Sequence, residues 1–428
     1  MQHRGRIASI SGEDSRTLLQ MSTSQAETFP PFDDSLADIA IDPANMKRLS
    51  PSCQQLVSEK FDDALSKSKI IIRSALADRE LAPIVMNHKC NGCVLTPAGL
   101  NLDMAHTVAK YIYHHHNGPD AELPGIKIYD TEIHKPLIVK DIEKVGDLWI
   151  EMETTIEHLA QSTSAEIMHA TIKCVFHSIT PLGVRLQECG YCYIKFEPYE
   201  AWLSEWSHYT PFILDRIANL HRRACTENNM DVQLVQRAAA YKLFESFVQY
   251  NSKYQNMCEV VFNTKNNEAT SIIDLPHLDP NTDFTGPYYL DASCHVSGFV
   301  ANAVEPDKDK NAFVSHGVAA MKLSPKFQPD RVAKLTNATT PTTPAISRAP
   351  SFSAEPANMA FRGIRNYVQM RQDPTEKSVI KGDVFVLQDG EIVGVWEGVR
   401  FKKIPRRVLN VFLPPPKRKV SFSQNAKR

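Results

Sequence analysis

Two short segments, about two hundred residues apart, each carry one ionisable side chain directly before an expected helix. His88 lies in NHKCNGCVLTP, and Asp291 lies in YYLDASCHVSGF. An imidazole, whose unperturbed pKa is about 6.5, exchanges protons near neutral pH, and a carboxylate can fix its tautomer or protonate a departing oxygen. Neither half of the chain contains both groups, so packing of the two halves against each other would assemble a proton-transfer site.

The elements expected around these two residues follow the same course twice along the chain. After His88 a helix begins near Pro97, and strand-like runs of alternating polarity follow it up to residue 200. The pattern over 201–250 is helical, with YKLFESFVQY its strongest segment, and beyond it come two strands, a strand end and helix over YYLDASCHVSGFVANAV, and about four more strands. The first helix carries one apolar stripe, formed by Leu100, Met104, Val108, Ala109 and Ile112.

Each half is therefore predicted to be an α+β unit, in which an antiparallel sheet wraps one hydrophobic helix. Two such units joined edge to edge would give one continuous sheet with two central helices. The predicted boundaries are a disordered leader over 1–45, a first unit with His88 over 46–200, a second unit with Asp291 over 201–416, a flexible insertion in it at about 333–358, and a basic disordered tail over 417–428.

Composition excludes several classes of function. The 428 residues are 43% hydrophobic, enough for a large core, and 48 Lys and Arg balance 49 Asp and Glu. A chain with a formal net charge of −1 has no global field that would attract nucleic acid or an anionic membrane. No stretch approaches the about 20 apolar residues of a membrane span, and the N-terminus lacks a signal-peptide pattern. We expect a cytoplasmic protein that binds neither nucleic acid nor membrane.

The cysteines form two Cys-x-x-Cys pairs, Cys90 with Cys93 and Cys189 with Cys192. The two pairs are far more distant in the chain than the about 15–20 residues between the halves of a zinc ribbon. Both pairs also fall in strand-like runs, where small buried side chains are common. No metal site is therefore predicted. Nine cysteines, an odd number, suit a reducing compartment better than a disulfide framework.

Motif spacing gives the most specific signal. His88, Gly92 and Pro97 fit H-x-x-x-G-x-x-x-x-P, and Asp291 with His295 fits D-x-x-x-H. With these motifs the chain resembles the dehydratase-like double hot-dog family, and within it the product template domains of fungal non-reducing polyketide synthases. The resemblance covers nearly all of 50–415 and includes the segments LSPSCQQLVSE, EIHKPLIV, RAAAYKLFESFVQYNSKYQNMCEVVFN, VSHG and GDVFVLQDGEIVGVWEGVRFKKIPRRVLN.

The resemblance implies a double hot-dog enzyme that cyclises a poly-β-keto thioester by aldol condensation, followed by dehydration and aromatisation. His88 is then the general base and Asp291 its partner, because a methylene between two carbonyls is acidic enough for a neutral imidazole. His295 and Asn302 lie four and eleven residues after Asp291, on the same helix face, and the resemblance makes them substrate-binding residues.

Gly92 and Pro97 have supporting roles in this prediction. A glycine lets the backbone approach the substrate closely, and a proline fixes the turn into the following helix. Four sites depart from the family pattern, and they leave ring-closure position and substrate length open: Asn87, Cys90, Ala98-Gly99 and Ala292.

Partners also follow from the resemblance. The substrate would be carried on the phosphopantetheine of an acyl carrier protein or of a non-reducing polyketide synthase, with no cofactor held by the chain itself and, by analogy only, a homodimer. The basic residues Lys402, Lys403, Arg406 and Arg407 are a candidate docking surface for an acidic carrier, with a solvated face as the default explanation. Since no carrier motif or G-x-S-x-G segment is found, the chain is expected to act in trans or to be a fragment of a synthase.

Two alternative functions stay open at the level of sequence. The same two motifs serve a β-hydroxyacyl thioester dehydratase of the same fold. A non-catalytic scaffold that binds a carrier protein would also need the fold, although it has no physical need for both ionisable groups.

Overall fold

The computed structural model describes residues 46–61, 68–139, 146–159, 167–226, 231–274, 286–303, 305–327 and 363–414. The predicted leader, insertion and tail lie outside these described residues. The chain from Met46 onward forms one compact unit. The division of this unit at residue 200 stays a prediction.

Fourteen strands of the described chain form one antiparallel sheet. Thirteen follow each other in the order β1-β2-β7-β8-β9-β5-β13-β17-β16-β14-β12-β11-β10, and β15 pairs with β16 alone. The first half supplies β1 (Gln55–Lys60), β2 (Lys69–Ala75), β5 (Gly125–Ile133), β7 (Trp149–Leu159), β8 (Ala170–Ile179) and β9 (Arg185–Glu197). The second half supplies β10 (Val232–Gln236), β11 (Met257–Asn263), β12 (Glu268–Ile273), β13 (Asn311–Leu323), β14 (Ile364–Gln369), β15 (Arg371–Gln372), β16 (Val379–Gln388) and β17 (Glu391–Pro405).

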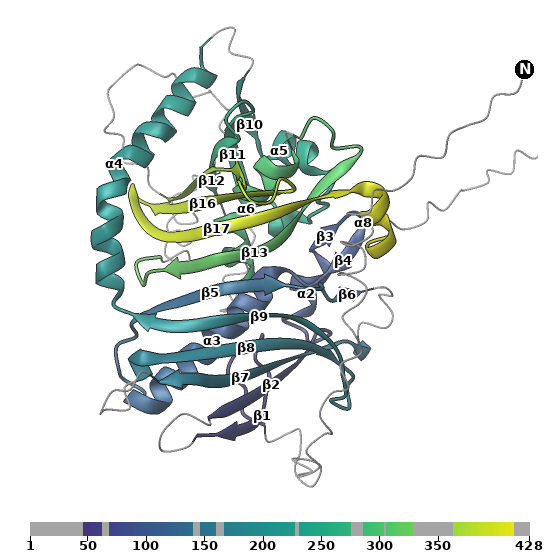
Figure 1. Cartoon of the computed structure of the whole chain (residues 1–428), viewed down its shortest axis with the longest axis vertical. Helices are drawn as coiled ribbons and strands as arrows, with labels where there is room; N and C mark the ends of the chain where they lie inside the picture. Colours follow the sequence, from purple (N-terminus) through teal and green to yellow (C-terminus); the bar gives the residue numbers. More distant parts are fainter. Residues whose placement is uncertain are drawn as a thin grey trace, which may run out of the picture. The chain divides into compact units, whose positions relative to one another are not determined.

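The two halves join where β5 pairs with β13, in an antiparallel register that places Ile128 opposite Met321 (Figure 1). Both of these side chains are buried, so the junction belongs to the core and not to the surface. The edge-to-edge joining expected from the sequence is confirmed. A tight hairpin at Asp389-Gly390 joins β16 to β17, and both turn residues have the positive φ that a two-residue turn requires.

Two central helices, α3 (Ala98–Asn117) and α6 (Gly286–Asn302), lie against each other inside the sheet. A Cβ atom added to Gly99 would lie 2.9 Å from the backbone oxygen of Pro287, so the glycine permits this close approach. The apolar stripe predicted for α3 is buried throughout. The strand end predicted before Asp291 is wrong, because α6 begins at Gly286 and the fixed φ of Pro287 suits a first helical turn.

The remaining described elements surround this core. The helices are α2 (Ala82–Met86), α4 (Tyr199–Ala224), α5 (Arg237–Phe244) and α8 (Arg406–Phe412), the 3-10 turns are η4 (Ile167–His169) and η5 (Ser252–Tyr254), and a small sheet contains β3 (Lys89–Cys90), β4 (Cys93–Leu95) and β6 (Ile138–Val139). The long amphipathic helix α4 packs its apolar side against β10, β11, β12 and β17. The helix predicted over YKLFESFVQY ends at Phe244, because Val248 instead forms a bridge with Cys90.

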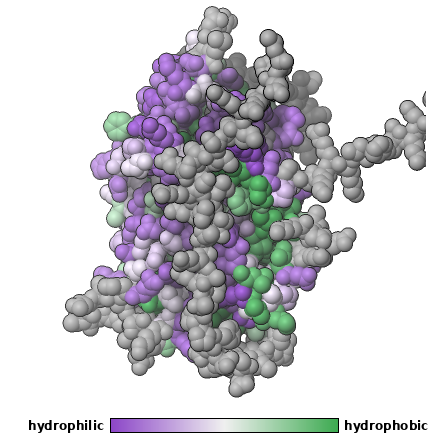
Figure 2. All heavy atoms as spheres, turned by 45° about the vertical axis from the view of Figure 1, so that its right-hand side comes forward, coloured by the Kyte–Doolittle hydropathy of each residue, from purple (hydrophilic) through white to green (hydrophobic). Residues whose placement is uncertain are grey.

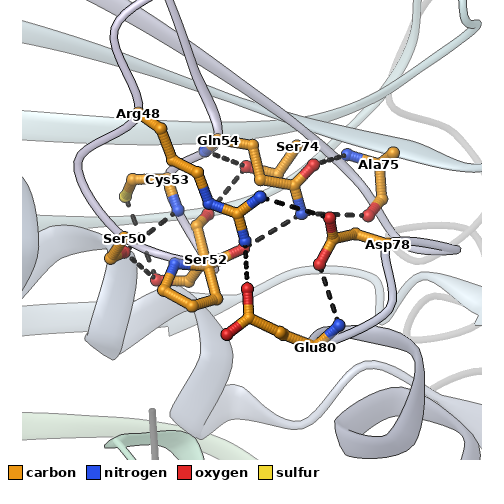
Figure 3. Close-up of polar contacts among 10 residues, drawn as sticks. Arg48, Ser50, Ser52, Cys53, Gln54, Ser74, Ala75, Asp78 and Glu80 are labelled. Atoms are coloured by element: carbon orange, nitrogen blue, oxygen red, sulfur yellow. Dashed lines mark hydrogen bonds and ion pairs between the residues drawn. The ribbon is translucent and has the colours of Figure 1, made fainter. Parts of the chain in front are cut away.

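The first described segment is tied to the sheet by polar contacts (Figure 3). Gln54 bonds the backbone of Ala75 through its side-chain oxygen, at 2.9 Å, and Ser74 donates to the backbone oxygen of Ser52, at 2.7 Å. The Ser52 hydroxyl in turn donates to the buried carboxylate of Asp103, at 2.5 Å. This chain of bonds fixes α3 relative to the first strands.

Most described residues on the face drawn in Figure 2 are hydrophilic, and the hydrophobic ones gather in one band. Inside the molecule, the buried apolar side chains form a large core cluster that draws on both halves and a second cluster beneath α4. Among the described helices, none has the length and apolar character that crossing a bilayer requires.

Candidate active site

A tight hairpin positions His88. The residue lies two positions after the last residue of α2, and its backbone N–H donates to the oxygen of Val85, at 3.1 Å. The chain then turns back through Asn91 and Gly92, whose φ angles of 51° and 79° fit a two-residue turn that favours Asn-Gly. Gly92 therefore serves the turn, and its N–H donates to Oε1 of Gln249 at 2.8 Å. The hairpin brings Leu95 opposite His88, with the Leu95 N–H 3.2 Å from the His88 oxygen.

The two ring nitrogens of His88 have different partners. Nδ1 lies 3.0 Å from the backbone oxygen of Leu95, and a carbonyl only accepts, so Nδ1 carries the hydrogen. Nε2 then has a free lone pair, which accepts a hydrogen bond from the Tyr250 hydroxyl at 2.9 Å. Burial lowers the pKa of His88, and the Asp291 carboxylate only partly opposes this effect. The imidazole is therefore held neutral, with its lone pair on Nε2.

Asp291 lies on α6, one turn before His295. Oδ2 of Asp291 is 3.3 Å from Nδ1 of His295, but the geometry of this contact is not that of a hydrogen bond. Within the described part of the chain, Oδ2 and both ring nitrogens of His295 have no hydrogen-bond partner, and the His295 side chain is only 2% exposed. Buried polar atoms without partners are costly, so these three atoms are placed to bind a polar ligand.

Tyr250 lies next to both His88 and His295. Its ring centroid is 4.8 Å from that of His88 and 5.0 Å from that of His295, in a perpendicular arrangement with the latter. The charge of Asp291 also acts on the pKa of His88 and of Cys90, which come from the first half of the chain. The predicted imidazole and carboxylate therefore belong to one cluster of neighbouring side chains, linked through Tyr250 and His295.

Aromatic side chains that are not among the predicted site residues surround His88 and His295 or contact these rings. They come from α5, the segment after it and α6: Tyr241, Phe244, Tyr250, Tyr254, Tyr288 and Phe299. The signal in the sequence was the recurrence of aromatic residues over YKLFESFVQYNSKY. The sequence pattern predicts a helix over YKLFESFVQY. Backbone pairing of the segment after Phe244 with the His88 hairpin brings Tyr250 beside His88 instead.

The other predicted site residues occupy supporting positions. Pro97 is the N-cap residue of α3, in an extended conformation, as expected for a residue that fixes the turn into the helix. Asn302 differs from the prediction. Its Nδ2 donates to the Phe313 oxygen and its Oδ1 accepts from the Phe313 N–H, both at 2.9 Å, and Nδ2 also lies 3.3 Å from the Gly298 oxygen. The amide of Asn302 is thus used to tie α6 to β13, and we no longer include it among the ligand-binding groups.

The predicted basic docking residues are mostly engaged within the chain. Lys402 pairs with Glu376 at 2.9 Å, and Lys403 pairs with Glu305 at 2.8 Å. Arg406 donates to the backbone oxygen of Lys308 at 2.5 Å. Arg407 is exposed, and no ion pair of Arg407 with another described residue is found. A docking role for these four residues stays a prediction, with Arg407 its most available cation.

The cysteine pairs lie in strands, as expected. Cys90 and Cys93 face each other in the β3–β4 hairpin, and Cys189 and Cys192 belong to β9. All are free thiols, and burial raises the pKa of Cys189 to about 11. Among the described residues, no three His, Cys, Asp or Glu side chains converge in a way that could hold a metal ion.

Comparison with known proteins gives relatives of one kind. No family model matches the chain. The chain is 37% identical over 373 residues to non-reducing polyketide synthase PKS1 of Zymoseptoria tritici, and 31% identical over 373 residues to non-reducing polyketide synthase 1 of Elsinoe fawcettii. Each match covers 87% of this chain and 15% of the relative, so the chain spans about a seventh of the length of these synthases.

Solved structures with the same fold are polyketide synthase dehydratase domains. The dehydratase domain from the CurJ module of curacin polyketide synthase has a TM-score of 0.54 at 14% identity, over 85% of this chain and 99% of that domain. The dehydratase domain of the polyketide PpsC from Mycobacterium tuberculosis has a TM-score of 0.51 at 10% identity, over 83% of this chain and 98% of that domain. At these identities the likeness establishes the fold alone, which is the predicted double hot-dog.

Proposed function

We propose that the chain is a product-template-like cyclase, on the basis of its similarity to fungal non-reducing polyketide synthases and of the fold that it shares with polyketide synthase dehydratase domains. It would fold a carrier-bound poly-β-keto thioester and close a ring by aldol condensation, followed by dehydration. The observation that carries the proposal is the lowered pKa of His88 together with the nearby oxygen of Asp291, which has no hydrogen-bond partner among the described residues.

His88 acts as the general base in this proposal. Nε2 carries the lone pair, and a methylene between two carbonyls is acidic enough to give it a proton at neutral pH. The C–H bond breaks, its electron pair becomes the enolate, and the enolate carbon attacks a second carbonyl of the same chain. The lowered pKa of His88 keeps the base unprotonated before the step. Leu95, which accepts from Nδ1, holds the required tautomer.

Asp291 and His295 have different roles beside the base. A carboxylate near the newly formed imidazolium stabilises its charge, which is why Asp291 raises the pKa of His88. The two unpaired nitrogens of the His295 imidazole offer one donor and one acceptor to a β-ketone or to the alcohol formed from it. His88 returns its proton to the alkoxide formed in the attack, which gives the alcohol. For the loss of water, His88 takes a second proton from the carbon that made the attack and gives it to the departing hydroxyl, which leaves as water while the C=C bond forms.

The proposed substrate is held by a partner and not by a resident cofactor. Since the relatives are polyketide synthases by name, we expect the thioester to be attached to the phosphopantetheine of an acyl carrier protein or of such a synthase. The carrier would approach with acidic residues, for which Arg407 is the exposed basic group of the described α8 segment. A homodimer stays a prediction by analogy.

The proposal is tested with a non-reducing synthase whose own cyclising segment has been removed. Adding the purified chain should change the products from uncyclised or spontaneously closed pyrones to one regiospecific aromatic product, measured by liquid chromatography with mass spectrometry. His88→Ala should lose this effect by at least about 100-fold, since the step then lacks its base. His134→Ala is the matched control, because His134 is exposed on the sheet and pairs with Glu132 and Glu188.

A β-hydroxyacyl thioester given to the same preparations separates the alternatives. Conversion of it to the unsaturated thioester, without any change in polyketide products, would assign the chain as a dehydratase and contradict cyclisation. Full product formation by a folded His88→Ala variant would instead favour the non-catalytic scaffold.

A further inference from the structure

The nitrogen that must accept the substrate proton already has a hydrogen bond. Nδ1 of His88 donates to the Leu95 oxygen, so Nε2 is the only basic nitrogen of the ring, and the Tyr250 hydroxyl donates to it at 2.9 Å. A methylene proton cannot reach Nε2 while this hydroxyl occupies its lone pair. Tyr250 must therefore release Nε2 when the substrate binds, and its hydroxyl hydrogen must find another acceptor.

The surroundings of Tyr250 keep it a neutral donor and place it centrally. Its half-buried ring is 4.8 Å from the ring of His88, 5.0 Å from that of His295 and 5.2 Å from that of Tyr254. Burial and the charge of Asp291 raise the pKa of Tyr250 well above its ordinary value. The hydroxyl therefore keeps its hydrogen throughout the neutral pH range, and it stands between the two groups assigned to the reaction.

The geometry points to Tyr250 as a further catalytic residue, an inference that rests on the function proposed above. When a methylene C–H meets Nε2, the proton passes to Nε2 and the electron pair forms the enolate, with its charge on the neighbouring carbonyl oxygen. The Tyr250 O–H turns from Nε2 to that oxygen and donates a hydrogen bond without giving up its proton. Tyr250 thus covers the base at rest and stabilises the enolate during the step.

Elementary geometry makes the oxygen the natural acceptor. The carbonyl oxygen is two bonds from the carbon that loses its proton, so a donor displaced from Nε2 by the C–H lies beside this oxygen. A donor aimed at developing negative charge in a dry site accelerates such steps by about 100- to 1,000-fold. The other tyrosines near His88 are less suited, since the Tyr254 hydroxyl donates to the backbone oxygen of Ile84 at 3.0 Å.

The first test needs no turnover and so is independent of the proposed function. The pKa of His88 is measured by NMR titration of imidazole-labelled protein in the wild type, Tyr250→Phe and Tyr254→Phe. The Tyr250 hydrogen bond favours the neutral imidazole, so its removal should raise the pKa of His88. Tyr254→Phe should leave that pKa unchanged, because the Tyr254 hydroxyl serves the backbone. An unchanged pKa of His88 in Tyr250→Phe overturns the inference.

The second test measures turnover with the synthase described above. Tyr250→Phe should lower kcat about 100-fold with little change in KM, and the acidic limb of its pH profile should move to higher pH. Turnover equal to or faster than that of the wild type would overturn the inference, because the hydroxyl would then only obstruct the base. If the wild type itself changes no product, the proposed function fails first and the catalytic role of Tyr250 fails with it, whatever the NMR titration gives.

Discussion

His88 illustrates how a single residue takes its chemistry from its neighbours. Removal from water lowers its pKa, and the Asp291 carboxylate raises it again without reversing the net effect. Activity that needs the neutral imidazole should therefore persist to lower pH than the ordinary pKa of histidine would allow, and it should be lost when the pH falls below the pKa that His88 has in this site.

Replacement of Asp291 should shift that titration in a predictable direction. Asp291→Asn removes the negative charge that favours the imidazolium, so the pKa of His88 should fall further, opposite to the change expected for Tyr250→Phe. NMR titration of His88 measures the shift. Asp130→Asn, an exposed carboxylate of β5, is the control and should give the wild-type titration. A His88 pKa that rises or stays constant in Asp291→Asn would show that the carboxylate of Asp291 does not act on the imidazole of His88.

The sequence was sufficient to name His88, Asp291 and His295 as candidates, whose roles stay predictions, because their motif spacing is specific and their side chains are chemically distinctive. It was not sufficient for Tyr250, whose hydroxyl reaches His88 only because the chain leaves the helix after Phe244. It was also misleading for Asn302, since residues on one helix face can point either to the candidate site or to a neighbouring strand. Only tertiary contacts distinguish these cases.

At the scale of elements, α3 contains a buried charge that bears on stability. Asp103 accepts a hydrogen bond from Ser52 and faces Gly286, where an added Cβ would lie 1.9 Å from Oδ1. Burial raises the pKa of Asp103 from the ordinary 3.8 of an aspartate to about 6. The folded protein therefore binds this proton more tightly than the unfolded chain does, and folding is favoured below pH 3.8 relative to neutral pH as far as this residue is concerned.

This sign gives a prediction for the free energy of unfolding. As the pH rises from about 4 to about 6, the wild type should lose about 2–3 kcal/mol relative to Asp103→Asn, whose amide stays neutral while its oxygen can still accept from Ser52. Urea denaturation at several pH values measures the difference. Asp120→Asn, at an exposed carboxylate after α3, should follow the wild type. Parallel curves for the wild type and Asp103→Asn would contradict the assignment of a raised pKa to Asp103.

Most elements were predictable because alternation of polar and apolar residues fixes strands that have one buried face. The long runs of β7, β8, β9, β13 and β17 were found in this way. The short elements β3, β6 and β10 carry too few residues for any period to be evident. The role of α4 was not predicted: its five buried apolar residues cover the second half of the sheet.

At the scale of the whole molecule, the site exists only because the two halves are joined. The His88 hairpin bonds the segment after α5, with the Asn91 N–H 2.7 Å from the Phe247 oxygen and the Gln249 N–H 2.9 Å from the Lys89 oxygen. The same hairpin bonds the end of the described chain, where Nδ2 of Asn91 donates to the Leu413 oxygen at 2.7 Å. Positions this far apart in the sequence cannot be paired from local patterns. Separation of the halves would therefore remove the support of the base.

These joints predict that the two halves unfold together. Loss of the β5–β13 pairing would expose Ile128 and Met321 to water and would separate α3 from α6 at Gly99, so neither half retains a complete core alone. Hydrogen exchange with mass spectrometry, at increasing urea concentration, should show peptides from β7 and β8 losing protection at the same midpoint as peptides from β14 and β16. The exposed end of β10 is the internal control and should exchange at low urea through local opening. Two separate midpoints for the two halves would mean that each half folds independently. The candidate site would then form only when two preformed halves dock.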